Sequence, residues 1–206
     1  MVSMRILLGL TALALSIPAN AQVFNVLEGG SVGPLFAAQF FFEVSGVTGP
    51  IADIDVRLAM SCEDVTGVSF DLFAPNGLAG LNWNAPLGTG AHFQDTYLDD
   101  EVAGSRLGQP GSDIAPFAGP EWGGRRYRPP TDLNVFDGTN PNGVWLLIAY
   151  NFSSITTEAW LHKSGEAAPW GQAIGTQLII TPVPEPSCLL ALGSGLLCAL
   201  LKRQRR

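Results

Sequence analysis

The stretch 131–150, TDLNVFDGTNPNGVWLLIAY, constrains the fold of this 206-residue chain more than any other. Asn140-Pro141-Asn142-Gly143 has the composition of a tight turn, because Pro fits its second position, Asn tolerates the third and Gly relieves the fourth. The run 144–150 that follows is almost entirely apolar, which is typical of a strand covered on both faces, although a short buried helix has the same pattern. We expect this run to be the central strand of a β-sandwich.

Other segments have strand patterns as well. In 51–60, IADIDVRLAM, the side chains of Asp53, Asp55 and Arg57 alternate with apolar ones, which predicts a half-buried strand with one face in water. Further strands are expected at 36–44, 68–73, 93–98, 157–163 and 174–181. Charged residues make up only 14% of the chain, and 24 Gly and 15 Pro supply turns, which favours an all-β domain over a helical one. The Gly- and Pro-rich stretch 103–130 is expected to be a long surface loop.

Three motifs occur in an order known from one family: FQDTYLDDEV, then APFAG, then YRPPTDLNVFDGTNPNGVWLLIAY. In this order they resemble the P domain (P/Homo B domain), the β-sandwich beside the catalytic domain of furin-like and kexin-like proprotein convertases and of many bacterial subtilases. The resemblance implies a jelly-roll β-sandwich over residues 22–182. At 61–65 the chain has SCEDV where the family usually has a His and a Gly-Asp-Leu run, so no function of that loop is carried over.

Residues 1–21 have the three parts of a secretory signal peptide. Arg5 lies in a short basic start, 6–17 is apolar, and Ala19-Asn20-Ala21 is a small-x-small cleavage site. We therefore expect the mature chain to begin at Gln22.

The C-terminal segment 183–206 also has three parts. The motif Val183, Pro184, Glu185, Pro186, Ser187 precedes an apolar run at 188–201 and a basic end at 202–206. As a helix the run is only about 21 Å long, which is short for a hydrocarbon core of roughly 30 Å. Together the parts resemble a PEP-CTERM sorting signal, which implies a short transmembrane helix in the inner membrane and processing by an exosortase. The family also implies release or attachment at the cell surface, together with exopolysaccharide.

The charge of the expected domain restricts its partners. Residues 22–184 carry six basic and 17 acidic side chains, a net charge of −11. Such a surface repels nucleic acid and anionic membranes and suits divalent cations or neutral glycans. Cys62 is the one cysteine in this part of the chain, so no internal disulfide is expected there.

No pattern of catalytic residues is visible. His92 and His162 lie outside any recognisable hydrolase motif, and metalloprotease and nucleotide-binding motifs are missing. We therefore expect no catalytic residues and no enzyme activity. Carboxylate pairs of the glycosidase kind remain open, because nothing in the sequence selects one pair.

The acidic cluster Asp95, Asp99, Asp100 and Glu101 is the candidate metal site. Calcium takes six to eight oxygen ligands, which carboxylates and backbone carbonyls at a strand end can supply. A solvated strand end explains the same run, and Asp137 either joins the site or belongs to an Asp-Gly turn.

Two tryptophans and two arginines are candidates for ligand contact. Trp122 and Trp170 lie in Gly- and Pro-rich loops, where indole rings can stack on sugars or fasten their own loop. Arg125 and Arg126 can hold an anionic sugar or offset the acidic surface.

The sequence as a whole predicts an exported, noncatalytic module of the cell surface or extracellular matrix that binds or organises exopolysaccharide or protein. Two alternatives stay open: an accessory module for a separate secreted subtilisin-like protease, and a hydrolase with an unrecognised site.

Overall fold

The computed structural model describes residues 20–63, 65–81, 90–102, 117–118, 126–129, 131–152 and 158–184. Asn20–Val183 form one compact unit. Most of the expected signal peptide, the sorting tail from Glu185 on, Trp122 and Arg125 lie outside the described residues. Within the described ranges, no helix has the length and apolar character needed to cross a membrane.

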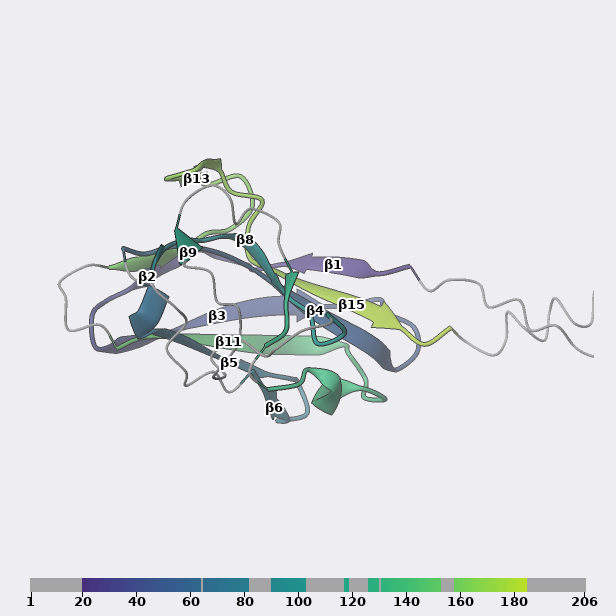
Figure 1. Ribbon diagram of the computed structural model, residues 1–206. Coiled ribbons are helices and arrows are strands. Elements are labelled where there is room, and N and C mark those ends of the chain that lie inside the picture. Colours follow the sequence, from purple (N-terminus) through teal and green to yellow (C-terminus); the bar gives the residue numbers. More distant parts are fainter. Residues whose placement is uncertain are drawn as a thin grey trace, which may run out of the picture. The chain divides into compact units, whose positions relative to one another are not determined.

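The described residues form two main β-sheets, as predicted for an all-β sandwich (Figure 1). The first sheet has the order β1 (Gln22–Asn25), β15 (Gln177–Pro182), β4 (Ile51–Ser61), β12 (Ala159–Leu161) and β2 (Gly30–Val32). In addition, β8 (Phe93–Leu98) pairs with β4, and β10 (Arg126–Tyr127) pairs with β8. The second sheet has the order β3 (Phe36–Val44), β11 (Gly143–Asn151), β5 (Val68–Phe73) and β6 (Ala79–Gly80). Every pair within these sheets is antiparallel except β8 with β10.

Short elements complete the described part of the chain. They are the pairs β7 (Gly90–Ala91) with β9 (Phe117–Ala118) and β13 (Ala167–Ala168) with β14 (Gly171–Gln172), and the 3-10 turns η1 (Val65–Gly67) and η3 (Asn134–Phe136). The predicted loop 103–130 thus contains β9 and β10, and the rest of it lies almost wholly outside the described residues.

Most strand predictions are confirmed. The strands predicted at 36–44, 68–73 and 93–98 have the predicted bounds, and the one predicted at 51–60 extends to Ser61. The two C-terminal strands are shorter than predicted, because the chain leaves the sheet at residues 163–175 and returns to it.

Strand β11 is central in its sheet, with β3 on one side and β5 on the other. Its residues Trp145, Leu147 and Ala149 are fully buried, and the Trp145 ring packs edge-on against Phe136 at 5.0 Å. The indole N–H of Trp145 donates a hydrogen bond to the carbonyl of Pro141 (2.8 Å). The predicted turn before β11 therefore fastens the largest side chain of the core.

The expectation that β11 is covered on both faces is wrong. Val144 is 56% exposed, and Leu146 and Ile148 are half-buried, so the strand buries alternate residues only. Phe41 of β3 pairs with Leu146 and is also exposed. The β3–β11–β5 sheet thus presents apolar side chains on its outer face.

The expectation of a wet face on β4 is also wrong. Asp55 and Arg57 are 6% and 7% exposed, because β15 and β8 flank the strand on both sides. The Arg57 guanidinium contacts the Gln177 side chain (3.3 Å) and lies 5.1 Å from the centre of the Tyr97 ring. Neighbouring strands therefore bury polar groups that the alternation alone assigns to solvent.

Strands β12 and β15 lie one after the other along the same side of β4. His162, just after β12, donates its N–H to Ala59, and Thr176, just before β15, donates to His162. Residues 163–175 leave this ladder as an excursion that contains β13, β14 and Trp170. Figure 1 shows β13 on the side of the first sheet away from β3 and β11. Trp170 of this excursion packs against the rings of His92 and His162.

Candidate functional site

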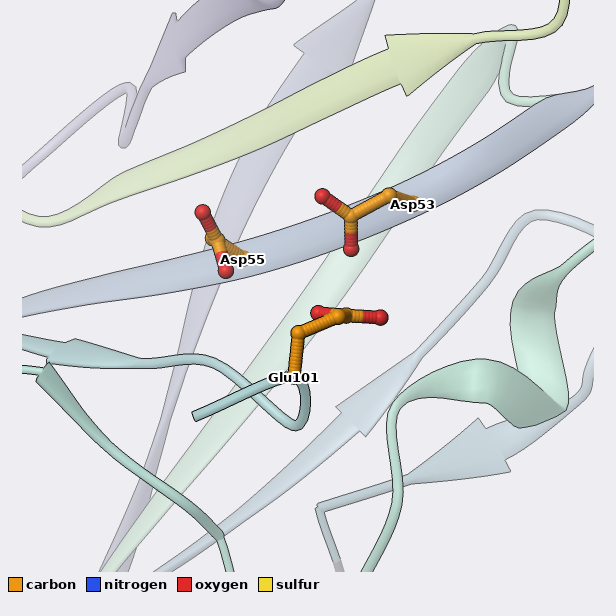
Figure 2. Close-up of side chains that lie close together, drawn as sticks. All are labelled: Asp53, Asp55 and Glu101. Atoms are coloured by element: carbon orange, nitrogen blue, oxygen red, sulfur yellow. The ribbon is translucent and has the colours of Figure 1, made fainter. Parts of the chain in front are cut away.

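Three carboxylates lie close together near the N-terminal end of β4. Asp53 and Asp55 are two residues apart on β4, so their side chains share one face. Glu101 follows β8, which pairs with β4, and each of the three residues offers an oxygen within 4.8 Å of the others. Figure 2 shows the Asp53 and Asp55 side chains directed from β4 toward Glu101.

Hydrogen bonds hold the loop after β8 in place. The Asp99 carboxylate accepts the N–H of Glu101 (3.0 Å), and the Asp99 N–H donates to the carbonyl of Tyr127 (2.9 Å). Asp100 turns away and accepts the N–H groups of Leu133 and Asn134, both at 3.0 Å. Asp100 therefore ties the loop to η3 and leaves Glu101 facing β4.

Arg126 is the cation of the site. Its guanidinium donates to Asp55 (3.0 Å) and to Asp99, and it lies 4.9 Å from the centre of the Tyr97 ring. The hydrogen bond with Asp99 raises the pKa of Arg126, so this side chain stays charged. It partly offsets the negative charge of the cluster.

The carboxylates of the cluster hold protons more tightly than free carboxylates do. Burial, followed by the charges of Asp99 and Asp53, raises the pKa of Asp55 to about 6. Glu101 is exposed as a residue, yet partial burial of its carboxylate and the charges of Asp53 and Asp100 raise its pKa to about 8. Burial also raises the pKa of Asp53 and of Asp137.

The cluster has the donor set of a hard cation. One oxygen of Asp53 and one of Asp55 are buried and have no hydrogen-bond partner among the described residues, and the Asp55 side chain is only 8% exposed. Oxygen ligands 2.3–2.6 Å from a calcium ion lie up to about 5 Å apart, which is the spacing observed here. Asp53, Asp55 and Glu101 therefore fit a calcium ion that is completed by water or backbone carbonyls.

The four carboxylates predicted from the sequence are thus placed in different surroundings. Glu101 lies in the cluster, and Asp99 and Asp100 support it through the contacts above. Asp95 lies within β8, four residues before Asp99 and so about 13 Å from it along the chain direction. The side chain of Asp95 is outside the described residues. Asp137 is the exposed residue that follows η3, and the charges of Asp100 and Asp53 act on its pKa.

The sequence prediction did not include Asp53 and Asp55. The alternation of polar and apolar residues in 51–60 placed both side chains on one face of a strand, and this was the sequence signal that could have identified them. Only the pairing of β4 with β8 shows that this face lies against Glu101.

Two of the predicted ligand contacts are described. Arg126 is bound to Asp55 and Asp99, and Trp170 is half-buried, with its ring 5.6 Å from that of His92 and 5.5 Å from that of His162. Val183 and Pro184 follow β15, and the Val183 N–H donates to the carbonyl of Pro50 (2.8 Å).

Comparison with known proteins gives little similarity. No family model matches the chain, and no curated protein matches it. Among solved structures, it is similar to the crystal structure of an Aeromonas sobria serine protease in complex with the chaperone ORF2, with 12% identity and a TM-score of 0.38. The match covers 82% of this chain and 27% of the matched chain, so the present protein spans about a quarter of the length of that chain.

Proposed function

We propose that this protein is an exported module of the cell surface or extracellular matrix, which binds or organises exopolysaccharide or protein and holds a calcium ion. The observation that carries the calcium proposal is the convergence of Asp53, Asp55 and Glu101, in which one buried oxygen each of Asp53 and Asp55 lacks a hydrogen-bond partner among the described residues. The cation would neutralise a cluster whose negative charge Arg126 offsets only in part.

Export and surface location are part of the same proposal. They rest on the signal-peptide pattern at 1–21 and on the sorting motif at 183–187 with its apolar run and basic end. The two-sheet sandwich supports a P-domain-like jelly roll for the part between them. An exosortase is the proposed processing partner.

Sedimentation with the exopolysaccharide of the producing cell tests the polysaccharide function. Purified residues 22–183 are mixed with the isolated polymer in calcium and in chelator, and the Asp53→Asn variant serves as the matched cation-site control. We expect the protein to sediment with the polymer in calcium and to remain soluble in chelator. Failure to sediment under both conditions would rule out a direct polysaccharide function.

The outer face of the second sheet favours one alternative, a protein partner such as a separate secreted protease. Phe41, Val144, Leu146 and Ile148 present apolar surface there, and contiguous apolar surface is typical of protein contact. Copurification of a partner, lost on Val144→Lys while the fold is retained, would support this alternative.

A further inference from the structure

A second polar group lies at the opposite end of the outer face of β4. Ser61 is the last residue of β4 and pairs with Trp160 of β12. His162 is two residues beyond Trp160 and so lies on the same face as Ser61. The Ser61 hydroxyl oxygen is 3.0 Å from Nε2 of His162, across 101 residues of sequence.

Glu166 completes the group from the first turn of the excursion. Its Oε2 is 3.6 Å from Nδ1 of His162 and accepts hydrogen bonds from the Lys163 N–H (3.1 Å) and from the Trp160 indole (3.4 Å). A Cβ atom at Gly29 would lie 2.6 Å from this carboxylate, so only glycine leaves room for it. The carboxylate thus lies at ion-pair distance from the ring nitrogen that faces away from Ser61.

We propose that Ser61, His162 and Glu166 form an acyl-transfer site, with Ser61 as nucleophile, His162 as general base and Glu166 as the positioning residue. A nucleophile, a base in hydrogen-bond contact and a carboxylate on the far nitrogen are the arrangement that activates a serine. This site is separate from the carboxylate cluster and adds a reaction to the binding function.

The reaction follows from the geometry. His162 Nε2 takes the hydroxyl proton as the Ser61 oxygen bonds to the carbonyl carbon of an ester. The ester C–O bond then breaks, and the alcohol leaves with the proton from His162. His162 then takes a proton from water, and the hydroxide bonds to the acyl carbon. The bond between this carbon and the Ser61 oxygen breaks, the acid leaves, and His162 returns the proton to Ser61.

Trp170 covers the site and supplies a hydrogen-bond donor. Its ring packs edge-on against His162, and its Nε1–H is buried without a hydrogen-bond partner in the described part of the chain. In this proposal the buried donor stabilises the oxyanion of the tetrahedral intermediate.

Trp160 indicates the class of substrate. It is 42% exposed beside Ser61, and its indole N–H is tied to Glu166, so its ring presents a fixed apolar plane to solvent. Such a plane suits a sugar ring. We assign the site to acyl esters of carbohydrates; the carbohydrate part rests on the proposed function, and the serine chemistry does not.

A fluorophosphonate tests the serine chemistry on the full chain, because the serine oxygen bonds to phosphorus as fluoride leaves. We expect labelling at Ser61, found by peptide mass spectrometry, and its loss in Ser61→Ala. Ser31 flanks Trp160 on the other side, so Ser31→Ala is the matched control and should be labelled like wild type. A folded wild-type protein that is not labelled at Ser61 would overturn the proposal, with near-ultraviolet circular dichroism reporting the fold.

Hydrolysis of p-nitrophenyl acetate tests the other roles. Trp170→Phe keeps an aromatic side chain and removes the donor, and we expect a rate about 100-fold lower. Glu166→Gln should lower the rate and move the acidic limb of the pH profile to lower pH, because the carboxylate favours the His162 imidazolium. An unchanged pH profile in Glu166→Gln would contradict the role of Glu166.

Hydrolysis of an acetylated monosaccharide tests the carbohydrate assignment separately from the serine chemistry. We expect the kcat/KM for this sugar ester to exceed that for p-nitrophenyl acetate at least tenfold. Equal kcat/KM values would contradict the carbohydrate assignment and leave the serine chemistry in place. Loss of polysaccharide sedimentation with Ser61 labelling retained would contradict the proposed function alone.

Discussion

Asp53 and Asp55 differ in how much unneutralised negative charge each offers to a cation. Asp55 is already bound to Arg126 through one oxygen, whereas Asp53 and Glu101 face the cluster without a cationic partner among the described side chains. The charge that a bound cation neutralises is therefore supplied mainly by Asp53 and Glu101, and their removal should weaken binding most.

Asp53→Asn and Glu101→Gln should each lower calcium affinity at least tenfold, because affinity follows the number of charged ligands. Isothermal titration calorimetry measures the change. Glu43→Gln, an exposed carboxylate on β3, is the matched control and should bind calcium like wild type. Wild-type affinity in both cluster variants would show that calcium does not bind at this cluster.

The raised carboxylate pKa values predict how stability changes with pH in metal-free protein. The folded chain binds protons more tightly than the unfolded chain at Asp55 and Glu101, so the free energy of unfolding should fall as pH rises from about 4 to about 8. The stabilisation from Asp55, on the order of 3 kcal/mol, is complete below its unfolded pKa near 4 and is lost as the pH passes about 6.

Urea unfolding in chelator at several pH values checks this slope. Asp55→Asn should flatten it between pH 4 and 7, and calcium should reverse it, because the cation favours the charged carboxylates. A metal-free stability that rises over this window would contradict the pKa directions.

At the scale of elements, the turn before β11 places the core strand. Gly143 has φ of 134°, and a Cβ atom there would lie 2.7 Å from Pro75, in the turn after β5. The Asn142 side chain binds both the N–H and the carbonyl of Val47, at 3.1 and 2.8 Å. This turn therefore joins three separate segments of the chain.

Gly143→Ala should destabilise the protein by about 2 kcal/mol or more, from an unfavourable backbone conformation and the collision with Pro75. Urea unfolding measures the loss. Gly30→Ala is the control, since a Cβ there meets only ordinary contact at 3.5 Å and the change should stay small. Equal losses of unfolding free energy in the two variants would contradict the role assigned to Gly143 in this turn.

At the scale of the whole molecule, the proposed cation site connects distant segments. Asp53 and Asp55 lie on β4, Glu101 follows β8, and Asp100 fixes the same loop to η3, which packs on the core through Phe136. A bound cation should therefore stabilise the folded unit as a whole.

Calcium at a hundred times its Kd should raise the free energy of unfolding by about 2.7 kcal/mol. For a unit of this size, that corresponds to a Tm increase of roughly 5 to 10 °C, measurable by scanning calorimetry with calcium and with chelator. A Tm that is the same in calcium and in chelator would contradict the calcium proposal.

Local patterns were sufficient to locate the longer strands. Side-chain alternation in 51–60 and 68–73 identified strands, because the period of a strand is written in consecutive residues. The Asn140 to Gly143 turn was predictable from its turn-forming residues, which are also adjacent in sequence. The two misjudged faces, those of β4 and β11, depended on which neighbours cover them.

The sequence by itself determined the all-β class, the positions of the longer strands and the central place of β11, and it singled out Glu101 as a candidate. Only the tertiary structure decided which side chains meet: Asp53 and Asp55 reach Glu101 because β4 pairs with β8, and His162 reaches Ser61 because β12 pairs with β4. Strand periodicity is a local property of the backbone and can be read along the chain. Strand pairing depends on contacts between residues far apart in sequence, which no local pattern records.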